Sequence, residues 1–266
     1  MYAFQYHRPQ SVADAAKLLA GNGDAKLLAG GHTLLPTMKM RLANPKVIVD
    51  LSRVAELKGI DKKGTALVIG AMATHDEVAT SSVVRGAIAG LIDVAGSIGD
   101  QHVRNRGTIG GSVANSDPAA DYPAAVLALG ATIRTNKREI KADDFFKGMF
   151  ETALADGEII TAIHFPKPDK SGYSKFPNPA SRYAIVGVFV AETAVGVRVA
   201  VTGAGGAVFR VKEMEAALTK KFAPESVANI SIPTDGLNED IHASAEYRAH
   251  LVTIMAKRAV AAAIGG

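Results

Sequence analysis

The 266-residue chain contains no cysteine and no tryptophan. Without cysteine it forms no disulfide, ligates no iron–sulfur cluster, has no thiol nucleophile and holds no zinc through thiolates. Charged residues make up 21% of the chain, and 30 Lys and Arg against 26 Asp and Glu leave a net charge of +4. Because this weak charge is spread along the sequence, it argues against a dedicated nucleic-acid or membrane-surface protein.

Several motifs are also missing. No apolar run reaches the roughly 18–20 residues that span a bilayer, and the stretch from Met1 to Pro9 lacks the pattern of a signal peptide, so we expect a cytoplasmic protein. The seven histidines show no metal-ligand spacing. No Walker A sequence and no Gly-x-Ser-x-Gly elbow occurs. Neither a hydrolase nor a metalloenzyme is therefore indicated, and no metal site is expected.

With 48% hydrophobic residues, the chain is long enough for two or three packed subdomains. The first 57 residues predict a compact βα module. Ser11 is predicted to cap a helix that ends at Gly21 to Gly23, a second helix is predicted from Pro36 to about Ala43, and Val47 to Val49 predicts a buried strand.

Beyond this module, strands and helices are mixed without a regular βαβ array, which predicts an α+β fold. Gly99 to Ser116 holds four glycines and is predicted to be neither ordinary helix nor strand. Pro166 to Pro179 holds four of the 11 prolines and is predicted to be a linker or a crossing between subdomains. The other predicted strands are 67–70, 131–135, 159–165, 184–190 and 194–201, and the other predicted helices are 84–98, 122–129, 211–218 and 243–263.

The segment Ala29-Gly30-Gly31-His32-Thr33-Leu34-Leu35-Pro36 lies between a predicted strand and a predicted helix. Paired glycines let successive backbone N–H groups point into one concavity, and a following helix start adds partial positive charge. Such a segment suits a phosphate or pyrophosphate, with Thr33 as a hydroxyl donor. The alternative is a simple turn that needs positive φ.

A second Gly-Gly pair lies in Arg104-Asn105-Arg106-Gly107-Thr108-Ile109-Gly110-Gly111-Ser112-Val113-Ala114-Asn115. Thr108, Ser112 and Asn115 are candidate polar donors beside it. Asp117, before Pro118, is predicted to be a helix N-cap. Asp121 is less easily explained by capping, and a carboxylate beside such a segment accepts hydrogen bonds from ribose hydroxyls. A third glycine-rich segment, 203–206, has Val208 where a Rossmann fingerprint needs glycine, so we interpret it as a turn.

The two Gly-Gly segments together, AGGHTLLP and TIGGSVANSDPAADYPA, resemble the FAD-binding medium subunits of the molybdenum hydroxylases, the xanthine dehydrogenase and carbon monoxide dehydrogenase family. The resemblance extends to FQYHRPQSVADAAKLL, GAMATH, DGEIITAIHFP, YSKFPNPASRYAIVGV and SAEYRAHL. Through KMRLANP and FFKGMFETAL it is greatest for the medium chains of the carbon monoxide dehydrogenase branch.

The resemblance implies an FAD-binding domain of the vanillyl-alcohol-oxidase or PCMH class. It consists of two α/β subdomains, 1–57 and 58–170, followed by a smaller C-terminal α+β domain, 171–266. It also implies which residues contact FAD: Ala29, Gly30, Gly31, His32, Thr33, Leu34, Thr108, Ile109, Gly110, Gly111, Ser112, Ala114, Asn115, Asp117, Asp121, Ile160, Lys175 and Tyr183.

The roles of these residues are carried over in the same way. Residues 29–34 would wrap the pyrophosphate, 108–115 would hold the second side of the cofactor, and Asp121 would meet ribitol or ribose hydroxyls. Ile160 would lie against the flavin through its backbone, and the ammonium of Lys175 would favour a negatively charged reduced flavin. The alternative for Lys175 is a solvated linker lysine. Many relatives carry an acidic residue shortly after the arginine that aligns with Arg182, whereas this chain has Tyr183, an aromatic that would stack on the flavin.

The implied function is electron transfer. A small [2Fe-2S] subunit and a large molybdopterin subunit would be the partners, in a dimer of heterotrimers. Electrons would pass through FAD on this chain to an external acceptor such as a quinone or NAD, and no residue of the chain would act in acid–base catalysis. The complex would lie in the cytoplasm, with peripheral association at the inner membrane as a further expectation.

Three alternatives stay open from the sequence. The first is the medium subunit of a related xanthine, aldehyde or nicotine dehydrogenase. A self-contained FAD oxidoreductase of the same fold is a second alternative, although no convincing acid–base set lies near the glycine segments. A non-redox binding module, in which the glycine segments are only turns, is a third.

Overall fold

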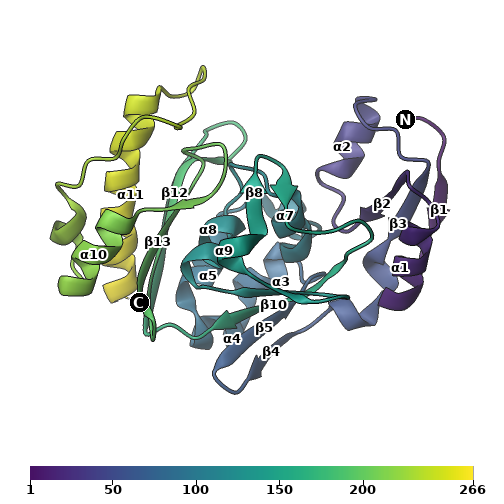
Figure 1. Cartoon of the computed structure of the whole chain (residues 1–266), viewed down its shortest axis with the longest axis horizontal. Helices are drawn as coiled ribbons and strands as arrows, with labels where there is room; N and C mark the ends of the chain where they lie inside the picture. Colours follow the sequence, from purple (N-terminus) through teal and green to yellow (C-terminus); the bar gives the residue numbers. More distant parts are fainter. Residues whose placement is uncertain (266) are drawn as a thin grey trace.

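The computed structural model describes residues 1–265, which form three main sheets, in order along the chain, and a two-stranded hairpin (Figure 1). An N-terminal module lies at one end of the molecule, a central antiparallel sheet with its helices in the middle, and a C-terminal sheet with two covering helices at the other end. No helix within this range is long and apolar enough to cross a bilayer.

The N-terminal module has a parallel sheet in the order β1-β3-β2. Ser11 accepts a hydrogen bond from the Asp14 amide and caps the first helix, as predicted. The central strand is buried along its whole length, which explains the apolar run from Val47 to Val49. The elements are β1 (Gln5–His7), α1 (Val12–Ala20), β2 (Ala25–Leu28), α2 (Leu34–Lys39), β3 (Val47–Asp50), η1 (Leu51–Arg53) and η2 (Ala55–Leu57).

The predicted bounds of the second helix are wrong at both ends. Helix α2 begins at Leu34, so Pro36 lies in its first turn, where the missing proline N–H has no helical acceptor to lose. It ends at Lys39, and Arg41 has a φ of 61°, in the left-handed region that does not continue a helix.

The central sheet is antiparallel in the order β4-β5-β10-β6-β7. Its strands are β4 (Ile60–Lys63), β5 (Ala66–Gly70), β6 (Thr132–Thr135), β7 (Glu139–Lys141) and β10 (Ile160–Pro166). A small hairpin joins β8 (Phe146–Gly148) to β9 (Glu151–Thr152). The helices of this part are α3 (His75–Thr80), α4 (Ser82–Ala87), α5 (Ala89–Gly96), α6 (Gln101–Arg104), α7 (Ile109–Asn115), α8 (Tyr122–Ala128) and α9 (Ala142–Phe145).

Two predictions for this region are wrong. The single helix expected over 84–98 is broken at Ile88, whose φ of −148° and ψ of 85° separate α4 from α5. The segment from Gly99 to Ser116 contains two helices, α6 and α7, capped by the side chains of Asp100 and Thr108. Glycine inside a helix costs about 1 kcal/mol relative to alanine, and the two caps and tertiary packing offset that cost here.

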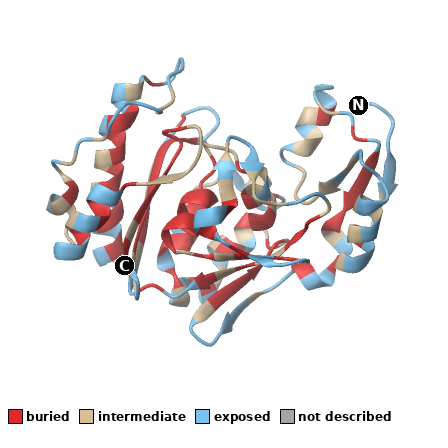
Figure 2. Cartoon of the chain, in the orientation of Figure 1, coloured by how far each residue is buried: buried red, intermediate tan, exposed pale blue. Residues whose placement is uncertain are grey.

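The C-terminal sheet is antiparallel in the order β11-β12-β13-β14. Strand β12 is the longest of the four. It is buried over eight consecutive residues because helices cover both of its faces (Figures 1 and 2). Helix α11 packs on one face, and α5 and α8 on the other. The elements are β11 (Lys170–Pro177), β12 (Ala184–Thr193), β13 (Gly196–Thr202), β14 (Phe209–Arg210), α10 (Lys212–Lys220), η3 (Pro224–Val227) and α11 (Ala245–Gly265).

Each sheet has a hydrophobic cluster of its own. We propose that these clusters mark the subdomain division expected after residues 57 and 170. The proline-rich segment is not simply a linker, because most of it forms strand β11. One face of β12 belongs to the central cluster through Phe189 and Ala191, and the other to the C-terminal cluster through Val188 and Val190. The C-terminal sheet is therefore packed into the centre of the molecule.

Candidate functional site

The first glycine segment, Ala29–Leu34, connects β2 to α2. Gly31 has a φ of +79°, which glycine adopts without steric cost. Within residues 1–265, the amide N–H groups of Gly31, His32, Thr33 and Leu34 donate to no acceptor. Because these residues are exposed or half-buried, the four successive N–H groups are available to an anion.

The second glycine segment lies directly against the first. A Cβ built on Gly30 would lie 2.3 Å from the carbonyl oxygen of Arg106 and 2.7 Å from the Cα of Gly107. A Cβ on Gly111 would lie 3.5 Å from that of Ala29. The two segments, which are 80 residues apart in sequence, thus approach so closely that Gly30 accepts no side chain.

The first three amides of α7 are already bonded within the chain. Ile109 and Gly110 donate to the carbonyl oxygens of Ala73 and Ala71, at 3.0 and 2.9 Å. Gly111 donates to the hydroxyl of Thr108, at 3.1 Å. A Cβ on Gly110 would lie 2.6 Å from the Ala71 oxygen, so this glycine serves the packing of α7. A ligand contact of these residues stays a prediction, and it would not use the N–H groups at the start of the helix.

What α7 offers to a ligand is side chains and surface. Ser112 and Asn115 are half-buried, lie one turn apart on the same face, and within residues 1–265 their side chains make no hydrogen bond. Ala114 is exposed. Polar groups without partners beside four free amides form a coherent ligand-facing surface.

The prediction that Asp117 caps the next helix is wrong. Helix α8 begins at Tyr122, with Asp121 at the N-cap position and no capping bond from its side chain. Asp117 accepts from the amide of Ala119 at 2.9 Å, a local turn that continues the left-handed bend at Ser116. Burial raises the pKa of the Asp117 carboxyl.

Asp121 is buried and paired. Its carboxylate accepts from the hydroxyl of Tyr173 at 2.5 Å and from the ammonium of Lys175 at 3.0 Å. Residues 173 and 175 reach the same carboxylate because alternate residues of β11 share one face of the strand. Burial raises the pKa of Asp121, and the charge of Lys175 opposes that rise.

The ammonium of Lys175 is fully used. Besides Asp121, it donates to the carbonyl oxygens of Ser97 at 2.8 Å and Arg182 at 3.0 Å. Three N–H groups thus meet three acceptors, and the side chain is 6% exposed. The alternative of a solvated lysine is wrong. A cavity of about 500 Å³ opens beside it, lined also by Asp93, Asn178 and Arg182.

Tyr183 follows Arg182, whose φ of 63° lies in the left-handed region. The side chain of Tyr183 is 48% exposed, and its partial burial and the nearby Asp117 and Asp121 carboxylates raise its pKa. The side chain is therefore accessible for stacking. That stacking is a prediction.

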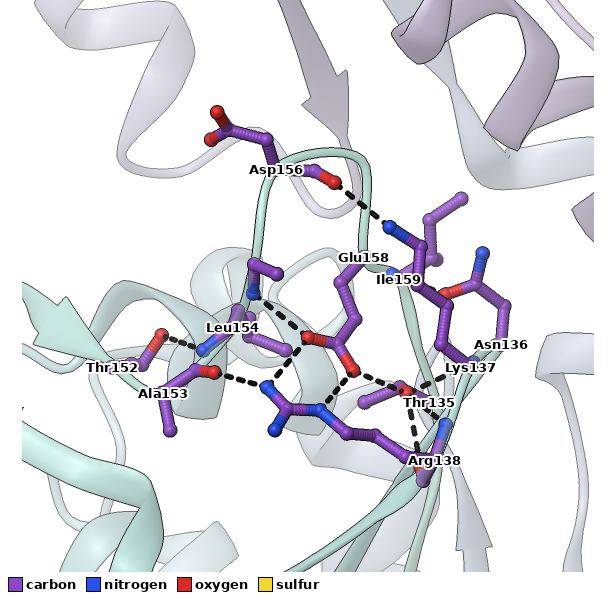
Figure 3. A network of polar contacts seen from close by, with 11 residues as sticks. Thr135, Asn136, Lys137, Arg138, Thr152, Ala153, Leu154, Asp156, Glu158 and Ile159 are labelled. Carbon is purple, nitrogen blue, oxygen red and sulfur yellow. Dashed lines mark hydrogen bonds and ion pairs between the residues drawn. The ribbon is translucent and has the colours of Figure 1, made fainter.

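Ile160 is buried at the start of β10. The two residues before it, Glu158 and Ile159, belong to a polar network (Figure 3). The Arg138 guanidinium, the Thr135 hydroxyl and the Ala155 amide all donate to Glu158, and the Arg138 contact is the main reason that the pKa of Glu158 falls to about 2. Next to it, the amide of Ile159 donates to the Asn136 side chain at 2.8 Å. The network therefore fixes the backbone that leads into Ile160.

The expected site residues thus form two groups at the two ends of α7. The glycine segments meet at its start, and Asp121, Lys175 and Tyr183 gather beyond its end. The helix between them has seven residues and is about 10 Å long. Within residues 1–265 no cluster of three or more metal-binding side chains is present.

Three residues that shape the site were missed in the sequence. Tyr173 could have been found, because it lies two residues before Lys175 on a predicted crossing segment. Arg182 contributes through its backbone carbonyl, which leaves no signal in the sequence. His75 lies in the GAMATH segment, where a buried contact to the second glycine segment is visible only in three dimensions.

A family profile described as the FAD binding domain in molybdopterin dehydrogenase matches residues 2–168. The chain belongs to this family. It is 36% identical to the carbon monoxide dehydrogenase medium chain of Hydrogenophaga pseudoflava, over 98% of this chain and 96% of the relative. It is also 36% identical to the nicotine 6-hydroxylase medium subunit of Paenarthrobacter nicotinovorans, over 97% and 96%.

Comparison with solved structures supports the same family. Reconstituted CO dehydrogenase from Oligotropha carboxidovorans superimposes with a TM-score of 0.90 at 33% identity, covering all of this chain and 99% of that one. The expected α+β fold and family are confirmed, and the chain is an FAD-carrying medium subunit of the molybdenum hydroxylase family, a flavoprotein oxidoreductase component. The free amides of the first glycine segment and the glycine contacts that close it fit the diphosphate of this cofactor.

Proposed function

We propose that this chain is the flavoprotein subunit of an aerobic carbon monoxide dehydrogenase. The observation that carries the cofactor part of this proposal is the run of four unpaired amides at Gly31–Leu34, closed by the contact of Gly30 with Arg106 and Gly107. FAD held here would supply a redox group able to exchange one electron with a cluster and two with an acceptor. The chain itself has no cysteine, so any iron–sulfur cluster that reduced this flavin would lie on a partner.

The residues would share the work along α7. The amides of Gly31–Leu34 and the hydroxyl of Thr33 would hold the diphosphate. Ser112 and Asn115 would line the middle of the cofactor, with Ala29, Ala114 and the α7 surface in contact with it. These side chains bind and orient, and none of them moves a proton of the substrate.

At the flavin end, Lys175 would act by its charge and not by a direct hydrogen bond, because its three N–H groups already have acceptors. Asp121 retains lone pairs for a ribitol hydroxyl after accepting from Tyr173 and Lys175. Tyr183 would stack on the ring, and Ile160 would contact it through its fixed backbone. Asp117 would border the same space.

The partners would be a small [2Fe-2S] subunit and a large molybdopterin subunit in a dimer of heterotrimers, with a quinone, NAD or another external acceptor. We place the complex in the cytoplasm, with peripheral association at the inner membrane. The similarity to carbon monoxide dehydrogenase medium chains supports the substrate. The equal identity to a nicotine 6-hydroxylase medium subunit makes a nicotine-type dehydrogenase the second candidate.

Purification of the tagged chain with its co-expressed partners tests this proposal. We expect one FAD per chain, co-purifying iron and molybdenum, and reduction of the bound flavin by carbon monoxide but not by nicotine, xanthine or an aldehyde. Reduction by nicotine alone would assign the second candidate. A chain that binds FAD and is reduced by a substrate without partners would show a self-contained oxidoreductase.

The site assignment has its own test. Gly31→Val puts a β-branched side chain at a φ of +79° at the start of the run of free amides, and we expect FAD to be lost on gel filtration. The matched control is Gly23→Val, at a glycine where a Cβ meets nothing within 4 Å. Both variants are first compared with the parent chain by circular dichroism. Full FAD retention in a folded Gly31→Val complex would overturn the assignment.

A further inference from the structure

Arg248 is a buried arginine that the proposed function leaves without a role. It lies in the SAEYRAHL segment as the fourth residue of α11, and its side chain is only 4% exposed. Its Nη2 atom donates to the Asp240 carboxylate at 2.7 Å. Its Nη1 atom donates to two backbone carbonyl oxygens, that of Ile185 at 2.7 Å and that of Gly203 at 3.1 Å. One side chain therefore joins three segments that lie apart in the sequence.

The place of this charge is unfavourable in itself. The first turn of a helix carries partial positive charge, which disfavours a cation there. The Nε–H group of Arg248 is sealed from solvent and has no acceptor within residues 1–265. Apolar side chains of similar volume often replace a buried ion pair without loss of stability. The reason for an arginine at this position therefore lies in what its two Nη atoms hold in place.

The two carbonyl groups that Arg248 binds belong to touching ends of neighbouring strands. Ile185 is the second residue of β12, and Gly203 directly follows the last residue of β13. Gly203 has a φ of +83°, and a Cβ built on it would lie 2.5 Å from the carbonyl oxygen of Ala184 and 2.8 Å from that of Ile185. The strand ends thus meet through their backbones, and the charged guanidinium binds both of them with one nitrogen.

The same strand ends also hold the turn between α7 and α8. The amide of Ala184 donates to the carbonyl oxygen of Ala119 at 3.2 Å, and the amide of Gly203 donates to that of Pro118 at 2.7 Å. The two acidic residues expected at the cofactor site, at positions 117 and 121, lie at the ends of this turn. A shift of the strand ends would therefore move both carboxylates.

We propose that Arg248 is a positioning residue of the flavin site, which binds the start of β12 to the end of β13 and thereby fixes the turn that carries Asp117 and Asp121. This inference rests on the proposed FAD site. Arg248 acts through the backbone and donates nothing to the cofactor. Its effect is to keep the turn in the binding geometry before FAD arrives. If the turn holds that geometry for only a fraction of the time, the apparent dissociation constant rises by the inverse of the fraction.

The test measures FAD affinity in the purified complex after flavin removal, at a temperature at which every variant is folded. Arg248→Met removes the guanidinium and keeps an apolar stem, and the dissociation constant for FAD should rise about tenfold, as for a turn that is correctly placed one tenth of the time. Arg248→Lys keeps the charge without the planar fork and should give an intermediate value. The matched control is Arg210→Met, which breaks the ion pairs of another arginine of the C-terminal sheet with Asp143 and Glu215. It should lower the melting temperature and leave FAD affinity unchanged.

Asp240 provides a second and milder test. Asp240→Asn removes the charged acceptor of Arg248 but keeps the Oδ1 atom, which accepts from the amides of His242 and Ala243. The dissociation constant for FAD should rise less than in Arg248→Met. It should rise no further when the two changes are combined, because both act on the same guanidinium contacts. Asp235→Asn, at an exposed aspartate of the same loop, is the control.

Spectroscopy of the bound flavin separates positioning from a loss of stability. At saturating FAD, the visible circular dichroism of the flavin should differ between the parent complex and Arg248→Met. It should stay unchanged in Arg210→Met, because only the loss of Arg248 displaces groups beside the cofactor.

The parent complex separates the two proposals. A parent complex that takes up no FAD would refute the FAD site itself. A parent complex that binds FAD, together with a folded Arg248→Met complex of equal affinity or unchanged flavin dichroism, would refute the role of Arg248 alone. An equal loss of affinity in Arg210→Met would attribute the effect to stability and would likewise overturn that role. Melting temperatures of all variants are measured first, and Arg248→Lys and Asp240→Asn decide if Arg248→Met does not fold.

Discussion

Removal of the Lys175 charge should destabilise the fold sharply. Lys175→Met keeps the length and apolar stem of the side chain but leaves Asp121 buried without its counter-charge, with both side chains only 6% and 5% exposed in the parent. The carbonyl groups of Ser97 and Arg182 lose their donor at the same time. Breaking one side of a buried ion pair costs about 3–5 kcal/mol, and we expect a loss of this size in the free energy of unfolding.

A double-variant cycle measures how much of that loss is electrostatic. Asp121→Asn removes the opposing charge and leaves an oxygen for the Tyr173 hydroxyl, so Lys175→Met combined with Asp121→Asn should recover about 2 kcal/mol or more relative to additivity. Urea unfolding followed by circular dichroism gives all four free energies. Additive losses would show that the pair is not coupled and would refute this reasoning.

The pH dependence of the stability of Lys175→Met provides an independent test. In Lys175→Met, burial of Asp121 acts unopposed by Lys175, so the pKa of its carboxyl in the folded chain rises further above that in the unfolded chain. A carboxyl whose pKa is higher in the folded chain than in the unfolded chain favours folding when it is protonated. It lowers the free energy of unfolding as the pH rises through its folded pKa. The destabilisation by Lys175→Met should therefore be smaller at acid pH than at neutral pH.

Three further predictions concern other parts of the site. Because burial lowers the pKa of His75 to about 4, this histidine should lower the free energy of unfolding by about 2 kcal/mol between pH 7 and pH 5. Urea unfolding should show a smaller decrease over that range in His75→Gln. An equal decrease would contradict the buried neutral state. Glu158→Ala leaves the Ala155 amide and the Arg138 side chain without their shared acceptor. Calorimetry should show a melting temperature lower by about 5 °C. An unchanged melting temperature would mean that the network does not stabilise the fold. Gly30→Ala places a methyl group 2.3 Å from a backbone oxygen, so FAD fluorescence titrations should show affinity reduced by about tenfold or more, with Gly23→Ala as the unaffected control; equal affinities would show that the glycine contact is dispensable.

Local patterns predicted those elements whose stability is local or whose burial is complete. Helix α1 was found from its Ser11 cap and its glycine stop, and β12 from an apolar run that helices cover on both faces. Helix α7 was missed because its glycines are required by contacts with a distant part of the chain. Gly110 makes room for the backbone of Ala71, and the propensity of glycine alone argues against a helix.

The site was predicted as a set of residues but not as a set of contacts. The two glycine segments were expected to act together, and the structure joins them at Gly30 and Gly107. The saturation of Lys175 could not be predicted, since two of its acceptors are backbone carbonyl groups. A backbone acceptor has the same chemistry in every residue type, so only the fold reveals it.

The turn between α7 and α8 is bound to the C-terminal sheet through its backbone. The carbonyl oxygens of Pro118 and Ala120 accept from the Thr202 hydroxyl, and that of Ala119 accepts from the Ala184 amide. A chimera that exchanges the C-terminal third between two relatives would therefore replace the support of Asp117 and Asp121 together with Lys175. The unit of exchange among such subunits is consequently the C-terminal sheet plus this turn, and a cut made at the proline-rich segment alone would separate parts that shape one another.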